Sequence, residues 1–180
     1  MSTELPSRSR ALRSSARITI VASTYNEKFT SALLENCLAE LKELGDMLAI
    51  DVVRVPGAFE VPVTVKRSIV VPDKYDKPDV VIALGVILRG STAHADLIGT
   101  AITNQLLSIS CDSLTPVIHE VLLLDDEQQA FARCVASALN RGREAARAAV
   151  AMLNMLEEQN ALSSDARRVA NVDMSASIMR

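Results

Sequence analysis

Aromatic residues are scarce in this chain of 180 residues, which has no Trp, two Tyr and three Phe. Histidine is scarcer still, because His94 and His119 are the only two, too few for a histidine-rich metal site. The dinucleotide fingerprint G-x-G-x-x-G is absent, so no phosphate-binding turn of that kind is expected. No apolar run approaches the ~18 residues of a membrane helix, and no secretory signal is seen, so we expect neither membrane insertion nor secretion.

Cysteine usage and charge narrow the class of protein further. Cys37, Cys111 and Cys134 are odd in number, scattered and without C-x-x-C spacing. This pattern is typical of reduced core thiols in a cytoplasmic protein rather than of disulfides, ligands or nucleophiles. A net charge of −3 gives no reason to expect nucleic acid. Because 49% of the residues are hydrophobic, we expect the chain to bury surface against copies of itself.

The two ends of the chain differ from its middle. Residues 1–17 are rich in Arg and Ser, which is faintly similar to an organelle transit peptide. The favoured interpretation is a flexible N-terminal tail, disordered or draped over a partner. Residues 161–180 are polar and are predicted to form a C-terminal tail. The sequence therefore predicts a single domain over residues 18–160.

Between these ends, apolar runs alternate with amphipathic stretches. The predicted strands are residues 18–23, 50–55, 80–88 and 115–123, and the predicted helices are residues 28–44, 61–69, 95–107 and 127–158, with a break at Asn140-Arg141-Gly142. Such alternation indicates a parallel sheet with helices on both faces. The expected fold class is therefore α/β, a three-layer αβα sandwich of flavodoxin-like type with strand order 2-1-3-4.

The stretch from Pro78 to His94 organises the rest of the chain. An unbroken apolar run, typical of a strand covered on both faces, ends abruptly in Arg-Gly-Ser-Thr-Ala-His, where a helix begins. Ligands of open α/β sheets bind at the carboxyl ends of the strands. The topology brings five side chains to one rim there: Tyr25, Phe59, Glu60, Thr92 and His94.

Each of these residues has both a chemical and an ordinary interpretation. Ser91 and Thr92 after Gly90 can bind a phosphate, or they can simply cap the helix. The positive end of the helix disfavours a protonated ring, so His94 is a candidate proton acceptor, or else a surface histidine. Tyr25 can stack on a planar ring or cover the sheet edge. Glu60 can bind a ligand or stabilise the helix dipole.

A phosphate site also needs a cation, and three arginines are candidates. Arg89 precedes the glycine turn, but it can equally form a structural pair. Arg133 and Arg141, eight residues apart on the last predicted helix, either face a partner subunit or only solvate the helix. A phospho-receiver needs an acidic pair after the first strand, and residues 23–26 supply none.

Taken together, these motifs resemble those of the lumazine synthase family of riboflavin biosynthesis. The resemblance covers about residues 18–156 and rests on Val55-Pro56-Gly57-Ala58-Phe59-Glu60-Val61-Pro62 and on Ala83-Leu84-Gly85-Val86-Ile87-Leu88-Arg89-Gly90-Ser91-Thr92-Ala93-His94. It implies condensation of 5-amino-6-(D-ribitylamino)uracil with 3,4-dihydroxy-2-butanone 4-phosphate, releasing phosphate and water. It also implies that no metal or organic cofactor takes part.

The resemblance assigns a role to each matching position. Tyr25 would stack on the pyrimidine, and Ala58, Phe59 and Glu60 would hold the ribityl chain. Backbone groups of Ile87 and Leu88 would line the ring edge. His94 would transfer protons, while Gly90, Ser91 and Thr92 would bind phosphate, with Arg133 reaching in from the adjacent subunit. His119 stands where a neighbouring subunit commonly supplies an aromatic ring, and Arg141 replaces a usual Lys.

The resemblance further implies a homo-oligomer with its active site between subunits. Family members form pentamers, some of which close into sixty-subunit icosahedral shells. The absence of an insertion before Asn140 favours a shell, and riboflavin synthase is a further candidate partner. Two alternatives stay open: a non-catalytic shell-forming or flavin-binding relative, and a generic phosphate-binding isomerase, which would need neither Tyr25 nor Glu60.

Overall fold

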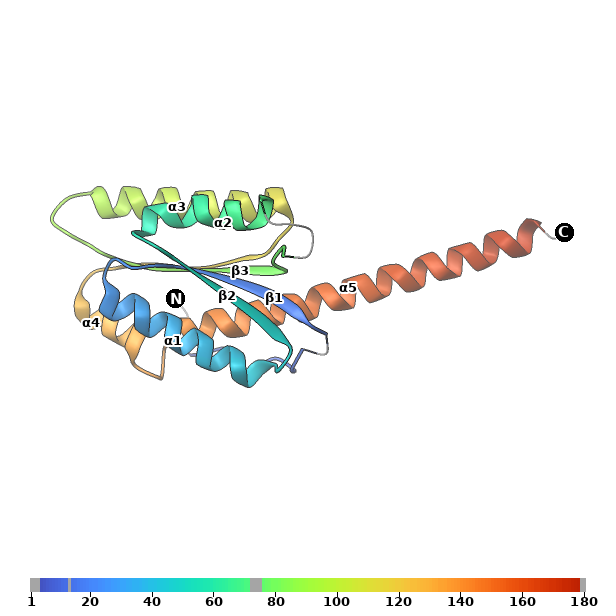
Figure 1. Ribbon diagram of the computed structural model, residues 1–180, viewed down its shortest axis with the longest axis horizontal. Coiled ribbons are helices and arrows are strands. Elements are labelled where there is room, and N and C mark those ends of the chain that lie inside the picture. The colour runs from blue at the N-terminus through green and yellow to red at the C-terminus, as the bar shows by residue number, and fades with distance from the viewer. Residues whose placement is uncertain (1–3, 13, 72–75, 179–180) are drawn as a thin grey trace.

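The computed structural model is built around a four-stranded parallel sheet with helices on both faces (Figure 1). It describes residues 4–12, 14–71 and 76–178, with side chains as far as residue 163. The strands are β1 (Ala16–Ser23), β2 (Leu48–Val55), β3 (Val80–Leu88) and β4 (Val117–Leu124). Their order is β2-β1-β3-β4 and each neighbouring pair is parallel, so the predicted fold class and strand order are confirmed.

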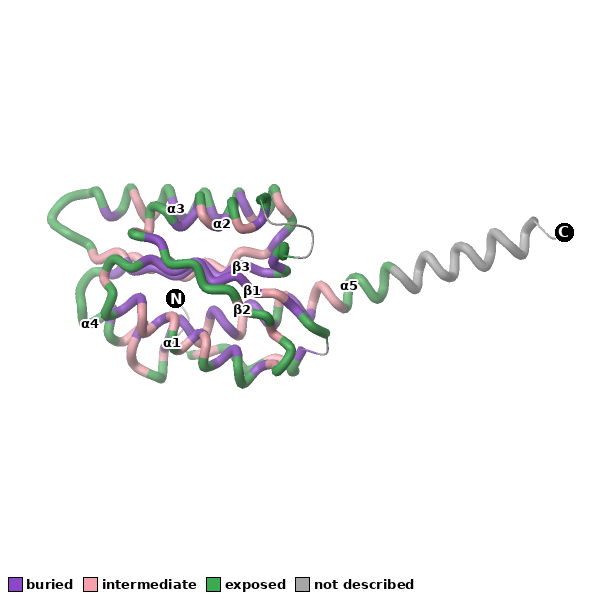
Figure 2. The backbone as a smooth tube through the Cα atoms, in the orientation of Figure 1, coloured by how far each residue is buried: buried purple, intermediate pink, exposed green. Residues whose placement is uncertain are grey.

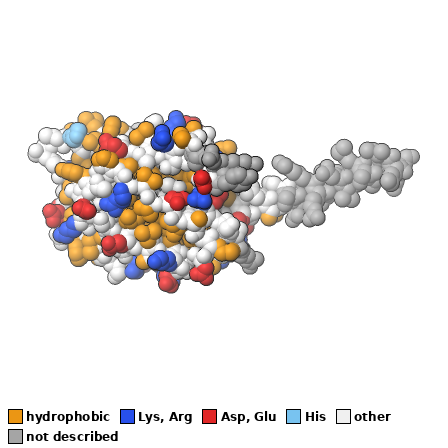
Figure 3. All heavy atoms as spheres, in the orientation of Figure 1, with side chains coloured by type: hydrophobic (Ala, Val, Ile, Leu, Met, Phe, Trp, Pro, Cys, Tyr) orange, Lys and Arg blue, Asp and Glu red, His pale blue; other side chains and the backbone are white. Residues whose placement is uncertain are grey.

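The central strand β3 and the edge strand β2 show how position in the sheet shapes composition. Residues 80–86 of β3 are all buried, as expected for a strand covered on both faces. In β2, by contrast, Val52 and Val53 are exposed. Figure 3 shows hydrophobic side chains gathered across the middle of the face where β2 crosses in Figure 1. This edge therefore leaves apolar surface in solvent.

The helices form the two outer layers. Helices α1 (Glu27–Leu44) and α5 (Arg141–Ile178) cover one face, and α2 (Val61–Val70) and α3 (His94–Ser113) cover the other (Figure 1). Successive side chains of β1 point to opposite faces of the sheet and pack in both layers. Ile20 belongs to the buried cluster beneath α1, and Val21 belongs to the one beneath α2 and α3. Figure 2 shows the resulting buried stripes along the inner sides of the helices.

The predicted break in the last helical region is confirmed. A short helix α4 (Glu127–Ala130) leads into a π-helical turn (Phe131–Val135), and α5 begins only at Arg141. The side chain of Asn140 donates to the carbonyl of Cys134 at 2.8 Å and so fixes this corner. Gly142 then lets α5 approach α1, because a Cβ there would overlap the carbonyl oxygen of Leu33 and lie 3.1 Å from the amide of Cys37.

The far end of α5 corrects a prediction. The helix was expected to end near residue 158 with a polar tail after it, but it continues to Ile178 and extends past the body in Figure 1. The reason lies in the sequence, since residues 143–178 contain neither Pro nor Gly and nothing there stops a helix. Other strand and helix bounds differ from the predictions by a few residues, most at α3, which runs on to Ser113.

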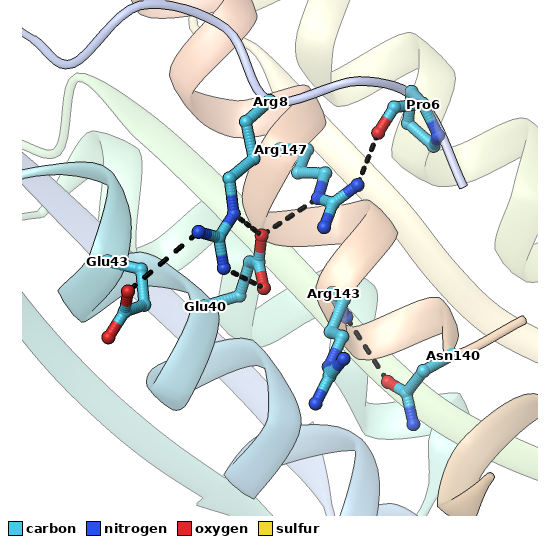
Figure 4. Close-up of polar contacts among 7 residues, drawn as sticks. All are labelled: Pro6, Arg8, Glu40, Glu43, Asn140, Arg143 and Arg147. Carbon is cyan, nitrogen blue, oxygen red and sulfur yellow. Dashed lines mark hydrogen bonds and ion pairs between the residues drawn. The ribbon is translucent and has the colours of Figure 1, made fainter. Parts of the chain in front are cut away.

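The N-terminal segment also differs from the flexible tail that was expected. Strand β1 begins at Ala16, and Leu12 is buried in the core. Arg8 binds the carboxylate of Glu40 on α1 at 2.7 Å, and Arg147 on α5 binds the same carboxylate at 2.8 Å (Figure 4). Arg147 also donates to the carbonyl of Pro6. The described part of residues 4–12 is therefore held against both helices.

Two further expectations concern the cysteines and membranes. Cys37 and Cys134 are buried thiols as predicted, and burial raises the pKa of each to about 12. Cys111 is exposed on α3, so the prediction of a core thiol is wrong there; it falls on the solvent side of the helix. Within the described residues, no helix combines the length and apolar character needed to cross a bilayer.

Candidate active site

A pocket of about 610 Å³ lies at the carboxyl edge of the sheet. It is lined by residues that follow β1 and β2, by the end of β3 and by the first turns of α3. Most of the residues predicted for the site meet here: Tyr25, Ala58, Phe59, Glu60, Ile87, Leu88, Gly90, Thr92 and His94. The parallel topology thus gathers side chains that lie far apart in the sequence.

Tyr25 is presented to the pocket by a tightly tied loop. Its amide donates to the carbonyl of Pro56 at 3.0 Å, and its ring is 72% exposed at the rim. The next residue, Asn26, has a left-handed backbone (φ 58°), and its side-chain amide donates from Nδ2 to the carbonyl of Val86 at 2.9 Å. Asn26 lines the pocket and was missed by the sequence analysis. Its signal was an Asn at a helix start, since Asn tolerates this conformation.

The segment after β2 places a carboxylate in the pocket. Ala58–Glu60 form a 3-10 turn, and α2 follows directly. Glu60 is the N-cap residue of α2 and makes no side-chain capping hydrogen bond, so its carboxylate can stabilise the helix dipole and still accept from a ligand. Its carboxylate lies close to Gly57, where a Cβ would come within 2.8 Å of Oε2. Phe59 is 63% exposed beside it. Gly57 is therefore the residue that gives the carboxylate its room.

The start of α3 forms the candidate anion site. Residues 91–94 are exposed, and a Cβ on Gly90 would meet no atom within 4 Å, so a ligand can approach the backbone closely. His94 is the first residue of α3, and its amide donates to the Thr92 hydroxyl at 3.4 Å. Because that contact is long, the hydroxyl stays available to a ligand. Ser91 lies between the lining residues Gly90 and Thr92 in the sequence but does not itself line the pocket.

Arg89 forms a structural pair rather than facing a phosphate. Its guanidinium contacts the carboxylates of Asp96 and Asp125, each at 2.6 Å. These two contacts tie the end of β3 to α3 and to the segment before α4. Two carboxylates compensate its charge, and Arg89 does not line the pocket. Among the residues that the structure describes, no Lys or Arg does.

Three of the predicted site residues do not line the pocket of their own chain. Arg133 belongs to the π-helical turn, and His119 lies on β4 beside α3. Arg141 is buried at the start of α5 and pairs with Glu144, so the expectation that it only solvates its helix is wrong. Nearby, burial raises the pKa of Glu120 to about 7, while Arg141 opposes that shift.

The described residues offer no cluster of side chains that could bind a metal ion. Across the described parts of the chain, no group of three or more His, Cys, Asp and Glu side chains is placed to hold a metal ion. The pocket combines one imidazole, one carboxylate, hydroxyls, helix amides and two exposed aromatic rings. Such a set can stack on a planar ring, bind hydroxyls and an anion, and move protons. The fold and site thus define a flavodoxin-like α/β protein with a small-molecule pocket at the carboxyl edge of its sheet.

Comparisons with known proteins place the chain within this class. The sequence model of the family described as 6,7-dimethyl-8-ribityllumazine synthase matches residues 15–157. A protein of that name from Nitrobacter hamburgensis is 36% identical over 151 residues, which cover 83% of this chain and 91% of that protein. The protein of the same name from Edwardsiella ictaluri is 38% identical over 144 residues, covering 79% and 90%.

A third relative, 6,7-dimethyl-8-ribityllumazine synthase 1 of Rhodopseudomonas palustris, is 37% identical over 143 residues, covering 79% of this chain and 86% of that protein. The chain belongs to the 6,7-dimethyl-8-ribityllumazine synthase family. The predicted family, and with it the prediction of a riboflavin-biosynthesis enzyme, is confirmed.

Proposed function

We propose that the pocket at the carboxyl edge is where the chain condenses 5-amino-6-(D-ribitylamino)uracil with 3,4-dihydroxy-2-butanone 4-phosphate. The observation that carries this proposal is the meeting of Tyr25, Glu60, Thr92 and His94 around one cavity. A planar ring, a polyhydroxyl chain, a phosphate and a series of proton transfers each need one of these groups. No metal or organic cofactor is required by the proposed chemistry.

The pyrimidine substrate is assigned to the inner part of the pocket. Its ring stacks on Tyr25, whose exposed face is otherwise unexplained in a soluble domain. Backbone groups of Ile87 and Leu88 read the ring edge. The ribityl chain runs along Ala58 and Phe59, and its hydroxyls donate to Glu60, whose side chain makes no capping hydrogen bond.

The phosphorylated substrate is assigned to the start of α3. Gly90, Ser91 and Thr92 offer amides and hydroxyls there, and the positive end of a helix stabilises an anion. His94 moves protons as the amine and carbonyl form a Schiff base, as phosphate leaves and as the ring closes. Much of the acceleration comes from holding two reactants together and stabilising the leaving phosphate.

A phosphate bound in this pocket lacks a cation from its own chain. Arg89 is paired with two Asp carboxylates and lies outside the pocket, and the described lining residues include no Lys or Arg. We therefore assign that cation to Arg133 of an adjacent subunit, together with a ring contact from His119. Arg141, buried and paired with Glu144, is assigned only a supporting role.

Exposed apolar surface supports an assembly that brings such residues together. Val52 and Val53 are exposed on the edge strand, and a mainly apolar cavity of about 330 Å³ between α2 and α3 includes Phe59 and Val63. We propose a homopentamer in the cytoplasm, able to close into an icosahedral shell, with riboflavin synthase as a candidate partner. Sedimentation velocity distinguishes the pentamer from the shell.

The first experiment is an absorbance assay for the lumazine product. The purified protein is mixed with both substrates, and the rate is compared with that of a protein-free control. Faster product formation supports the proposed function; an unchanged rate with intact pyrimidine binding would refute it and leave a binding protein.

Mixing two variants tests the assignment of Arg133. His94→Ala and Arg133→Ala subunits are dissociated, combined in equal amounts and reassembled. If Arg133 acts across the interface, random mixing makes about a quarter of the sites fully wild type, so activity returns. If Arg133 acts within its own chain, every site lacks one residue and no activity returns. Arg133→Ala alone should raise the KM for the phosphorylated substrate far more than that for the pyrimidine.

A further inference from the structure

Both ring nitrogens of His119 have hydrogen-bond partners. Nδ1 lies 3.1 Å from the amide nitrogen of Val121, and Nε2 lies 2.9 Å from the hydroxyl of Thr103 on α3. A backbone amide can only donate, so Nδ1 must be unprotonated and accept. The neutral ring then carries its proton on Nε2, and this proton is donated to the Thr103 oxygen.

The Thr103 hydroxyl completes the chain of hydrogen bonds. It donates its own proton to the carbonyl of Gly99 at 2.8 Å, which leaves its oxygen free to accept from His119. Gly99 also lies beside β4, since a Cβ there would be in van der Waals contact with the side chain of Leu123 at 3.4 Å. The network therefore fixes both the tautomer of His119 and the orientation of its ring.

Protonation of His119 would disrupt this arrangement. A second proton would have to sit on Nδ1, where the Val121 amide already points its hydrogen. Burial of the half-buried ring also lowers its pKa. Few ionisable groups surround it: β3 has none, α3 carries His94, Asp96, Cys111 and Asp112 at its two ends, and Glu120 is adjacent on β4, where alternation turns it to the opposite face.

We propose that Thr103 is a positioning residue that accepts the Nε2 proton of His119 and so holds the ring in one orientation and one tautomer, while the Val121 amide keeps Nδ1 unprotonated. The edge of β4 then presents a flat, uncharged ring face to the pyrimidine bound in an adjacent subunit. A free imidazole would be partly protonated near neutral pH and free to rotate. This inference rests on the proposed function in one respect, the contact between His119 and the pyrimidine ring.

The test compares three variants in the complete assembly. Thr103→Val keeps the shape of the side chain but removes the hydroxyl, while Thr103→Ser keeps the hydroxyl. His119→Phe replaces the imidazole by a ring that needs no hydrogen bond. We expect Thr103→Val to raise the KM for the pyrimidine by about 2–10-fold with kcat little changed, the range of one neutral hydrogen bond. Thr103→Ser should stay within about 2-fold of the wild type.

The His119→Phe background shows whether Thr103 acts through the imidazole. There, Thr103→Val should leave the KM for the pyrimidine unchanged. An equal increase in both backgrounds would overturn the proposal, because Thr103 would then act by packing alone.

Nitrogen-15 NMR of the labelled imidazoles tests the tautomer without any assay of activity. The chain has only two histidines, and a His94→Ala variant leaves the signals of His119 alone. We expect protonated Nε2 and unprotonated Nδ1 in the wild type, and a mixture of the two neutral tautomers in Thr103→Val, where the Nε2 proton has lost its acceptor. A wild-type ring protonated on Nδ1 would refute the proposal. If the wild type makes no lumazine, the proposed function fails, while these signals still decide the tautomer.

Discussion

Replacing Glu40 by Gln tests the most deeply buried charged contact in the described chain. Its side chain is only 3% exposed, and it accepts hydrogen bonds from Arg8 at 2.7 Å and from Arg147 at 2.8 Å (Figure 4). The hydrogen bond from Arg8, followed by the contribution of Arg147, lowers the pKa of Glu40 even though burial opposes the shift. The carboxylate thus joins the N-terminal segment, α1 and α5.

The magnitude follows from how exposed each partner is. Removing one member of a fully buried ion pair costs about 3–5 kcal/mol, whereas exposed pairs contribute about 0.2–1 kcal/mol. Arg147 is 15% exposed and Arg8 is 48% exposed, so Glu40 lies between these limits. We expect Glu40→Gln to lower the free energy of unfolding by about 2–3 kcal/mol. Arg147→Ala should cost more than Arg8→Ala for the same reason.

Thermal unfolding at a fixed protein concentration measures this loss. For a chain of this length the expected fall in Tm is about 4–12 °C, provided that sedimentation shows the same assembly. Glu43→Gln is the matched control, because Glu43 lies on the same helix, is 65% exposed and contacts Arg8 at 3.8 Å. Equal losses for Glu40→Gln and Glu43→Gln would refute the reasoning.

The lowered pKa of Glu40 also predicts how the loss of unfolding free energy caused by Glu40→Gln depends on pH. A carboxyl whose pKa is lower in the folded state stabilises the folded protein fully at pH values above its unfolded pKa. This stabilisation is lost as the pH falls through the folded pKa. The difference between wild type and Glu40→Gln should therefore stay constant from pH 8 to about pH 5 and shrink only in stronger acid.

Three further predictions concern packing, titration and catalysis. Gly142→Ala should lower the free energy of unfolding by about 1–3 kcal/mol, measured by denaturant unfolding, because the new Cβ overlaps the carbonyl of Leu33 on α1. Glu120 has a folded pKa of about 7, above its ordinary value, so its protonated form stabilises the folded state and this contribution is lost as the pH rises from about 5 to 7. The free energy of unfolding of Glu120→Gln, measured by denaturant unfolding, should therefore increase relative to wild type over that range. His94→Ala should slow turnover by roughly 10–10³-fold in the absorbance assay while substrate binding persists, because positioning remains.

Strand order and the break before α5 could be predicted because both have strong local signals. An apolar run such as Val80–Leu88 needs cover on both faces, and alternation of strands and helices leaves few topologies. The docking of residues 4–12 had no such signal, since Arg8 finds its partner Glu40 far along the chain. The end of α5 was missed because polar composition was taken as a stop, although only Pro or Gly would have supplied one.

The site was predictable to the extent that parallel strands end at one edge. Tyr25, Glu60 and His94 were brought together by topology alone, as the structure shows. Asn26 was missed because an Asn at a helix start is only a weak signal, and its contact with the carbonyl of Val86 depends on how the folded loop meets β3. The pairing of Arg89 with two Asp residues was left open, since sequence fixes neither the direction of a strand-end side chain nor its partners.

The scarcity of aromatic residues gives their positions unusual weight. Among the aromatic side chains that the structure describes, Phe29 is buried, whereas Tyr25, Phe59 and Phe131 are 72%, 63% and 52% exposed. Burying a ring of this size contributes about 1.5–3 kcal/mol to stability. A chain with few rings therefore forgoes several kcal/mol of possible stabilisation when three of them stay exposed to solvent. Tyr25 and Phe59 lie at the pocket, and Phe131 belongs to the same π-helical turn as Arg133. Because exposed rings of this kind mark surfaces that a ligand or another protein covers, we infer that the turn carrying Arg133 meets a second copy of the chain, as the proposed site between subunits would require.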